Sequence, residues 1–343
     1  MALQYMTGGD QLKPTAEQLH KESIVINALD STHIEEFGVE HYENMARGGV
    51  TAVNKTVALR ENFLEAMSGL ARWYAEIGVV GWDRFRVVLN GADVLACKRD
   101  GHVGLILGTQ NSKLVDDNLA NLDVLHRVGI RIIQLSYNRR NSAANGCAEE
   151  KDEGLSRFGK DLVRALNDKN IVVDLSHVGH RSAMEAATIS RAPVIASHSS
   201  MRSLCDNWRN IQDELVQAIA EREGVVGIAA LSNFLRDDAH ERGSAVEDYL
   251  DHVDYAVKLV GWEHVGVGLD IGHGRTQEHI DQIMRVYPEF KFPRRENYWA
   301  REIQQIDGFP HITAGLVRRG YTPEQVRGVV GGNFLRVFQA VWG

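Results

Sequence analysis

The chain has few cysteines, no long apolar run and no cluster of basic residues, and each of these absences excludes a class of protein. Three cysteines (Cys97, Cys147 and Cys205) cannot build a disulfide framework, and no two of them have metal-type spacing, which fits a reducing compartment. No apolar run approaches the roughly 18 residues that span a bilayer. The first residues lack a basic segment followed by an apolar core, so we expect no secretory signal and a cytoplasmic protein.

Basic residues are also scarce relative to acidic ones. The chain has 38 Lys and Arg against 46 Asp and Glu, a formal charge of −8, and no Lys/Arg run, which disfavours nucleic acid as a partner. Apolar residues make up 44% of the chain and charged residues 24%, which is typical of a globular protein. No linker or low-complexity segment divides the sequence. We therefore expect one domain over residues 1–343, which neither binds nucleic acid nor enters a membrane.

Short apolar runs alternate with helical patterns along the whole sequence. Amphipathic stretches, such as residues 157–169 and 245–260, lie between most of these runs. Repeated strand–helix units indicate a parallel sheet, and eight of them predict an α/β fold, a single (β/α)8 TIM-type barrel with long βα loops. A doubly wound open sheet is the alternative, but the first run lacks a following Gly-x-Gly-x-x-Gly. The expected strands are residues 24–30, 50–57, 103–110, 130–137, 171–177, 193–198, 224–231 and 265–270.

Two consecutive strands of this set end on histidine. The runs at residues 171–177 and 193–198 are β-branched and apolar until His177 and His198. Parallel strands buried on both faces need such runs, and α/β folds assemble their sites at the carboxyl ends of the strands. Two imidazoles on one rim suit zinc or a similar divalent ion. The alternative is a pair of histidines that only form hydrogen bonds.

Other polar residues at the expected strand ends are candidates for the same rim. Asp270 could act as the base for water activation or could only cap a turn. Arg209 could bind a substrate carboxylate as a bidentate pair, although composition alone favours a surface arginine. His33, His273 and Lys55 lie at or near strand ends without a decided role. In chain order the strand ends read Asp30, Lys55 or Thr56, Gln110, Tyr137, His177, His198, Asn233 and Asp270.

Two later segments carry local signals. Residues 272–298 are less regular and mix charged with aromatic side chains, which fits a lid, a subunit contact or a plain surface loop equally well. Thr322-Pro323-Glu324-Gln325 predicts a helix start. Thr322 can cap the helix, Pro323 suits its first turn, and Gln325 can reach back to the cap.

A series of motifs covers most of the chain in a fixed order. Because of these motifs, the chain resembles the renal or membrane dipeptidase family of the amidohydrolase superfamily. The resemblance implies a zinc-dependent (β/α)8 hydrolase that cleaves dipeptides or related small amides, often as a homodimer. The motifs are Gly129-Ile-Arg-Ile-Ile-Gln-Leu-Ser-Tyr-Asn138, Gly154-Leu-Ser-Arg-Phe-Gly159, Asp174-Leu-Ser-His177, Ser197-His-Ser199, Arg209-Asn210, Val265-Gly-Val-Gly-Leu-Asp270 and Gly331-Gly-Asn-Phe-Leu-Arg-Val-Phe338.

The resemblance also implies roles for individual residues. The family's late histidines match His177 and His198, its substrate-binding arginine matches Arg209, and its proton-shuttling aspartate matches Asp270. The early positions depart from the family pattern. The His-x-Asp of the first strand reads Ala28-Leu29-Asp30, the glutamate that bridges two metals reads Gln110, and the histidine after the fourth strand reads Tyr137.

These departures predict a site with one well-bound metal. Two neighbouring divalent ions repel, and an anionic bridge offsets that repulsion, which a neutral Gln110 cannot do. Without a histidine at Ala28, the first metal position keeps only Asp30 and is expected to be empty or weak. The second position keeps His177 and His198, with the Gln110 carbonyl oxygen as a candidate third ligand.

Three functions remain open at this point. The first is a mononuclear zinc hydrolase for a dipeptide, small amide or related C–N bond, in which Asp270 moves the proton and Tyr137 holds the substrate's developing oxyanion. The second is a two-metal dipeptidase in which His33 or His273 replaces the lost ligand. The third is a catalytically silent barrel that binds a small carboxylate through Arg209. One, two or no metal ions per chain would distinguish them.

Overall fold

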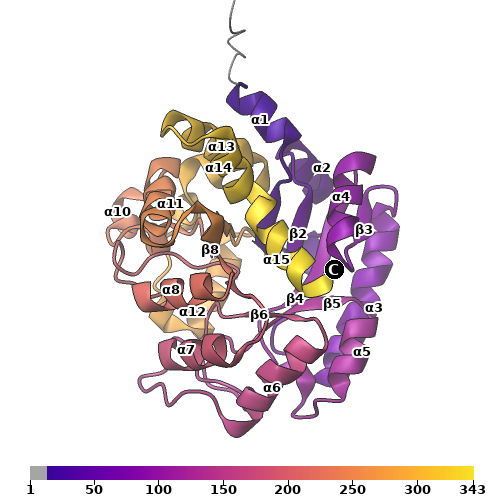
Figure 1. Ribbon diagram of the computed structural model, residues 1–343. Helices are drawn as coiled ribbons and strands as arrows, with labels where there is room; N and C mark the ends of the chain where they lie inside the picture. The colour runs from indigo at the N-terminus through magenta and orange to yellow at the C-terminus, as the bar shows by residue number, and fades with distance from the viewer. Residues whose placement is uncertain (1–13) are drawn as a thin grey trace, which may run out of the picture.

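The computed structural model describes residues 14–343 and forms a barrel of parallel strands surrounded by helices (Figure 1). Eight strands follow one another in the order β1-β2-β4-β5-β6-β7-β8-β9, and every recorded pairing is parallel. A parallel bridge from Asp30 to Ile271 joins the two ends of this row. The strands are β1 Ile26–Asp30, β2 Ala52–Ala58, β3 Phe85–Val87, β4 Val103–Thr109, β5 Ile130–Gln134, β6 Val172–Asp174, β7 Val194–Ala196, β8 Val225–Ile228 and β9 Val265–Val267.

The predicted (β/α)8 barrel is confirmed, with each of the eight expected strands present. Strands β6, β7 and β9 are shorter than predicted because the chain leaves the sheet before it reaches His177, His198 and Asp270. Two of these residues have left-handed backbone conformations, with φ of 64° at His177 and 54° at Asp270. The strands predicted from the sequence do not include β3. It is only three residues long and pairs with β4 outside the main row.

Helices cover the outside of the barrel and occupy the predicted amphipathic stretches. The predicted helix start at Thr322 is confirmed, since the Thr322 hydroxyl accepts from the Gln325 amide and Gln325 reaches back to the cap. The helices are α1 Ala16–Glu22, α2 Val39–Arg47, α3 Phe63–Val80, α4 Gly91–Asp100, α5 Asn121–Arg127, α6 Arg157–Asp168, α7 His180–Ile189, α8 Asp213–Glu221, α9 Ser232–Leu235, α10 Ala239–Arg242, α11 Val246–Val260, α12 Gln277–Val286, α13 Phe309–Arg318, α14 Pro323–Arg327 and α15 Asn333–Trp342.

The last helix closes the amino-terminal end of the barrel. In Figure 1, α15 runs across the middle of the molecule. Phe334 and Phe338 of α15 are fully buried and share a core cluster with residues near the strand starts, such as Ile26 and Ile132. Because this end is filled with apolar side chains, the carboxyl ends of the strands are left for a polar site.

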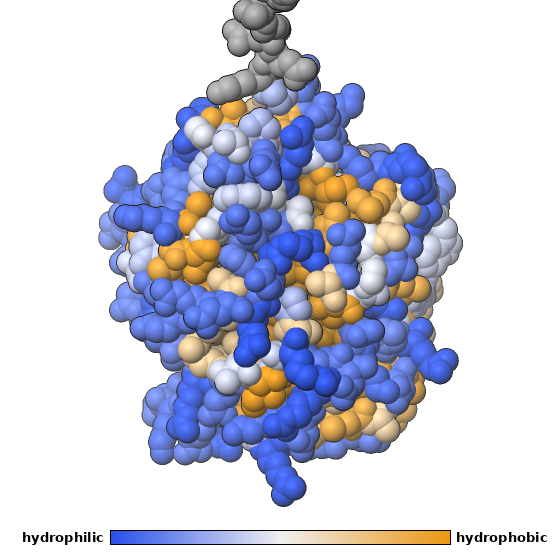
Figure 2. Space-filling model, in the orientation of Figure 1, coloured by the Kyte–Doolittle hydropathy of each residue, from blue (hydrophilic) through white to orange (hydrophobic). Residues whose placement is uncertain are grey.

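The surface is mixed in character. On the face shown in Figure 2, hydrophilic and hydrophobic residues alternate, and the hydrophobic ones form separate groups. The most exposed large apolar residues include Leu64 and Val79 on α3 and Trp82 just after it. Across residues 14–343, no helix is both long enough and apolar enough to cross a membrane.

Candidate active site

A cavity of about 550 Å³ lies at the carboxyl ends of the strands. It brings together Gln110, Tyr137, His177 and Asp270, four residues predicted for the site. A second cavity of about 200 Å³ is lined by His177 and Arg209, so His177 borders both spaces. His198 is fully buried behind His177 and lines neither of these two cavities.

The two histidines face each other through their Nε2 atoms, which lie 2.9 Å apart. The other nitrogen of each ring is already engaged. His177 Nδ1 lies 2.5 Å from the Asn138 Oδ1 atom, and His198 Nδ1 lies 2.7 Å from the Ser197 hydroxyl. Since Ser197 donates its own hydrogen to Asp174, its oxygen is left to accept from His198. Both Nδ1 atoms therefore donate, and both Nε2 atoms direct a lone pair toward the same space.

This arrangement fits a divalent metal ion at the Nε2 atoms. Zinc–imidazole bonds are about 2.0–2.1 Å long, so a separation of 2.9 Å corresponds to an angle of about 90° at the metal, and a tetrahedral angle needs about 3.4 Å. Burial, followed by the charge of Arg209, lowers the pKa of both histidines well below the usual value. The rings are therefore neutral, which is the form that binds metals.

Gln110 lies in the cavity wall, as expected of a third ligand. Its amide nitrogen donates to the Thr56 hydroxyl over 2.9 Å, so its carbonyl oxygen is the end that remains for another contact. Within residues 14–343, no group of three or more His, Cys, Asp and Glu side chains is placed to hold a metal. A metal at the histidine pair would therefore depend on a neutral side-chain oxygen and on solvent for its other ligands.

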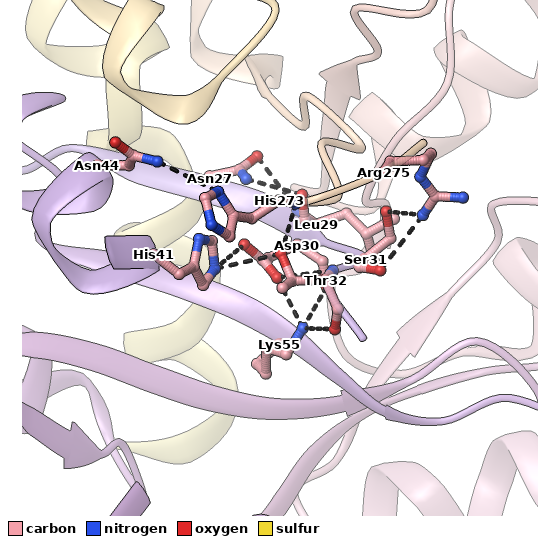
Figure 3. Close-up of polar contacts among 10 residues, drawn as sticks. All are labelled: Asn27, Leu29, Asp30, Ser31, Thr32, His41, Asn44, Lys55, His273 and Arg275. Carbon is pink, nitrogen blue, oxygen red and sulfur yellow. Dashed lines mark hydrogen bonds and ion pairs between the residues drawn. The ribbon is translucent and has the colours of Figure 1, made fainter. Parts of the chain in front are cut away.

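Asp30, the other predicted ligand, lies in a separate ion-paired cluster (Figure 3). Its carboxylate is fully buried, 2.7 Å from the Lys55 ammonium and 2.9 Å from His41 Nε2. Burial alone would raise the pKa of Asp30, but the charges of Lys55 and His41 and the hydrogen bond from Lys55 outweigh it and hold the pKa well below its usual range. The residues at this position do not fit a first metal ion, because Ala28 supplies no ligand and Asp30 is already neutralised.

Asp270 has the properties of a proton-transfer group. It lines the larger cavity together with Ser31, whose side chain lowers the pKa of the Asp270 carboxyl group. Burial raises the pKa of Asp270 to about 6, against the opposing charges of Arg275 and Arg209 and the opposing effect of Ser31. A carboxyl group with such a pKa exchanges a proton readily near neutral pH. The backbone oxygen of Asp270 accepts a hydrogen bond from the Trp299 indole at 3.1 Å, which fixes the turn.

Arg209 is a buried residue, which corrects the surface location favoured by composition. Only 1% of it is exposed. Its guanidinium donates to the Ser199 hydroxyl at 3.0 Å and to the His198 carbonyl at 2.7 Å. Its Nε–H has no recorded partner. Arg209 thus supports the backbone at His198 and borders the smaller cavity with part of its hydrogen-bonding capacity unused.

Tyr137 stacks on the metal-ligand candidate His177, with ring centroids 4.2 Å apart. Burial raises the pKa of Tyr137 well above its usual value, so the phenol stays neutral and can donate a hydrogen bond in the cavity. His33 lines the same cavity but stacks on His279, and His273 stacks on His41 and contacts Asn44. Neither histidine joins His177 and His198.

The two residues that orient the imidazoles are not predicted from the sequence, and the role of one segment is left open there. The groups that orient the imidazoles, Asn138 and Ser197, each directly adjoin a predicted site residue, and that adjacency is the signal that could have found them. The segment at 272–298 contains helix α12 and forms one wall of the cavity, so it is part of the site and not a plain surface loop. Its aromatic residues in that wall are Tyr287, Phe290, Phe292 and Tyr298.

Residues 45–291 match the family model described as membrane dipeptidase, peptidase family M19. The chain belongs to this family. An uncharacterized dipeptidase of Schizosaccharomyces pombe is 30% identical to it over 251 residues, which cover 72% of this chain and 55% of that protein. The resemblance expected from the motifs is thereby confirmed.

Solved structures share the fold of this M19 chain. An amidohydrolase from Pseudomonas aeruginosa is 31% identical and has a TM-score of 0.88 over 96% of this chain and 100% of the other. A metallo peptidase from Rhodobacter sphaeroides, bound to a phosphinate mimic of L-Ala-D-Ala, has 20% identity and a TM-score of 0.77 over 94% and 100% of the two chains. The present chain spans about half the length of the curated relatives it matches.

Proposed function

We propose that this M19 protein is a mononuclear metallohydrolase, with zinc or another divalent ion, that cleaves a dipeptide or a related small amide. The observation that carries the proposal is the pair of Nε2 lone pairs of His177 and His198, 2.9 Å apart in a buried site. Two facing lone pairs repel each other, and a cation that accepts both removes the repulsion. The engaged Nδ1 atoms hold the two rings in this orientation.

The side chains around the pair supply the remaining functions of a hydrolase. A divalent ion at this position would polarise a carbonyl group and make bound water more acidic. Asp270 accepts a proton from water and delivers it to the leaving amine. Tyr137 donates a hydrogen bond to the carbonyl oxygen as it gains charge. Arg209 borders the smaller cavity, which shares His177 with the larger one, and binds the substrate carboxylate there through the hydrogen-bonding capacity left on its guanidinium.

The larger cavity supports a small substrate. Its volume of about 550 Å³ lies within the range of about 300–1,000 Å³ typical of small-molecule sites. Aromatic residues from 287–298 provide an apolar part of its wall, in addition to the polar strand ends. A dipeptide or small amide with one apolar side chain matches this combination.

Metal content and hydrolysis test the proposal together. We expect about one zinc per chain, loss of that zinc in His177→Ala, and hydrolysis of at least one member of a panel of dipeptides and small cyclic amides. His311→Ala is the matched control, because His311 is an exposed histidine outside the site. Unchanged metal content in His177→Ala contradicts the mononuclear site. A metal-free, inactive wild-type protein that still binds small carboxylates would instead support the silent barrel.

The proposal extends to the assembly and the compartment. One domain is supported by the continuous strand order from β1 to β9. The family resemblance supports a homodimer, which light scattering after gel filtration would detect. The free thiols of Cys97, Cys147 and Cys205 are consistent with a reducing, cytoplasmic location.

A further inference from the structure

Lys55 is a charged side chain in the interior of the protein. It lies on β2 with 1% of its surface exposed, and its Nζ atom is 4.8 Å from the centre of the Trp73 ring. Nζ contacts three oxygen atoms (Figure 3): Asp30 Oδ1 at 2.7 Å, the Asp30 carbonyl at 3.5 Å and the Thr32 carbonyl. Three acceptors match the three hydrogens of an ammonium group, so Lys55 is a cation here.

Asp30 is the counterpart that makes this buried cation tolerable. A buried charge is stable only when it is paired and hydrogen-bonded. The Asp30 carboxylate meets Lys55 at one oxygen and His41 at the other, and both Asp30 and His41 are fully buried. Any other cation that used Asp30 as a ligand would lie within a few ångströms of the Lys55 ammonium and be repelled by it.

We propose that Lys55 is a built-in cation that takes the place of a metal ion at Asp30 and keeps divalent ions out of that position. This inference rests on the proposed mononuclear function and deepens it, since it gives the physical reason for one metal per chain. A metal ion can dissociate, whereas the Lys55 ammonium is tethered to β2 and closed off from solvent. The charge at Asp30 is therefore satisfied at every metal concentration.

The same ammonium also organises the edge of the larger cavity. It donates to the carbonyl group of Thr32, and the residue between Asp30 and Thr32 is Ser31, which lines the larger cavity together with Asp270. Arg275 donates to the Ser31 hydroxyl at 3.1 Å from the other side. The Lys55 ammonium is always present beside the turn at residues 30–32 and keeps it rigid. An exchangeable ion would do so only while it was bound.

A pair of variants tests the exclusion of metal by Lys55. The first, Ala28→His with Gln110→Glu, restores the missing ligand types but keeps Lys55, and the second adds Lys55→Ala. After equilibration with zinc and removal of free ions, elemental analysis should find about one more zinc per chain in the second variant than in the first. An equal zinc content in the two folded variants would overturn the proposal, as would a gain of one zinc while Lys55 is present.

The effect of Lys55 on zinc content can be tested independently of the proposed function. Both variants are also made with His177→Ala, and the expected difference of one zinc persists there, whether or not the histidine pair binds metal. Loss of the His177-dependent zinc with no effect of Lys55 would refute only this inference. No His177-dependent zinc, with the Lys55 effect intact, would refute only the mononuclear site.

A stability measurement on simpler variants decides the question if the multiple variants do not fold. Lys55→Ala should melt below the wild-type protein, and added zinc should raise its melting temperature by several degrees more than that of the wild type. Asp30→Asn with Lys55→Ala should lose this extra zinc effect, because the carboxylate is gone. Lys113→Ala, at an exposed lysine, controls for loss of a lysine charge. An equal zinc effect with and without Asp30 would contradict the proposal.

Discussion

The Nε2 atom of His177 lies 2.9 Å from the Nε2 atom of His198, and each ring is held by an acceptor at its other nitrogen. The two acceptors come from different parts of the barrel, since Asn138 follows β5 and Ser197 follows β7. The imidazole pair is therefore oriented by the fold itself. Such preorganisation lets a site bind metal with only two histidines.

The Asn138 amide should control metal affinity through His177. Asn138→Gly removes the acceptor of His177 Nδ1 but keeps a residue that tolerates the φ of 59° at this position. We expect zinc affinity to fall about 10–100-fold, measured by competition with a chelator, because the ring loses its orientation. Asn170→Gly is the control, since Asn170 has a similar φ of 53° at an exposed site. Unchanged affinity in Asn138→Gly would show that this amide does not orient the ligand.

Asp270 should set the acidic limb of the pH–activity profile, which is the range in which activity falls as the pH decreases. A base must be deprotonated to accept a proton, and burial raises the pKa of Asp270 to about 6. Activity, measured as kcat/KM, should therefore rise with pH through a midpoint near 6. Asp270→Asn should lower it by roughly 10²–10⁴-fold and abolish that limb. A limb that persists unchanged in Asp270→Asn would assign the titration to another group.

Ser31 should tune the same limb without carrying the proton. Its hydroxyl lowers the pKa of Asp270. Ser31→Ala removes this stabilisation of the charged form, so the pKa should rise and the limb should move to higher pH. Activity well above the limb should change little, since Asp270 is then ionised in both proteins. A downward shift of the midpoint would contradict this effect of Ser31 on the pKa of Asp270.

The barrel follows from the sequence because strand and helix periodicities repeat regularly along it. The ends of β6 and β9 were harder to predict, because the chain leaves the sheet before His177 and Asp270, both of which have left-handed backbone conformations. Strand β3 was missed since three residues carry too little pattern.

The sequence predicted which residues lie at the site better than it predicted the contacts that they make. His177, Gln110, Tyr137 and Asp270 meet at one cavity because barrel strands end at one rim. The sequence did not predict the ion pair between Asp30 and Lys55, because these residues lie on different strands and become neighbours only when β1 pairs with β2. In addition, a lysine at a strand end is usually solvated. The sequence alone predicts that Ala28→His with Gln110→Glu restores a metal, whereas the Lys55 ammonium predicts that it does not.

Arg209 should determine the preference for substrates with a free carboxylate. Its planar group already holds Ser199 and the His198 carbonyl, and only the rigid fork of an arginine can do so while also binding an anion. Arg209→Lys keeps the charge but loses the fork. We expect KM for a dipeptide to rise about tenfold or more, while KM for the corresponding dipeptide amide, which has no carboxylate, changes little. The ratio of the two KM values isolates the carboxylate contact from any general disturbance at His198. If Arg209→Lys weakens both substrates equally, the arginine supports the backbone at His198 and does not select the substrate.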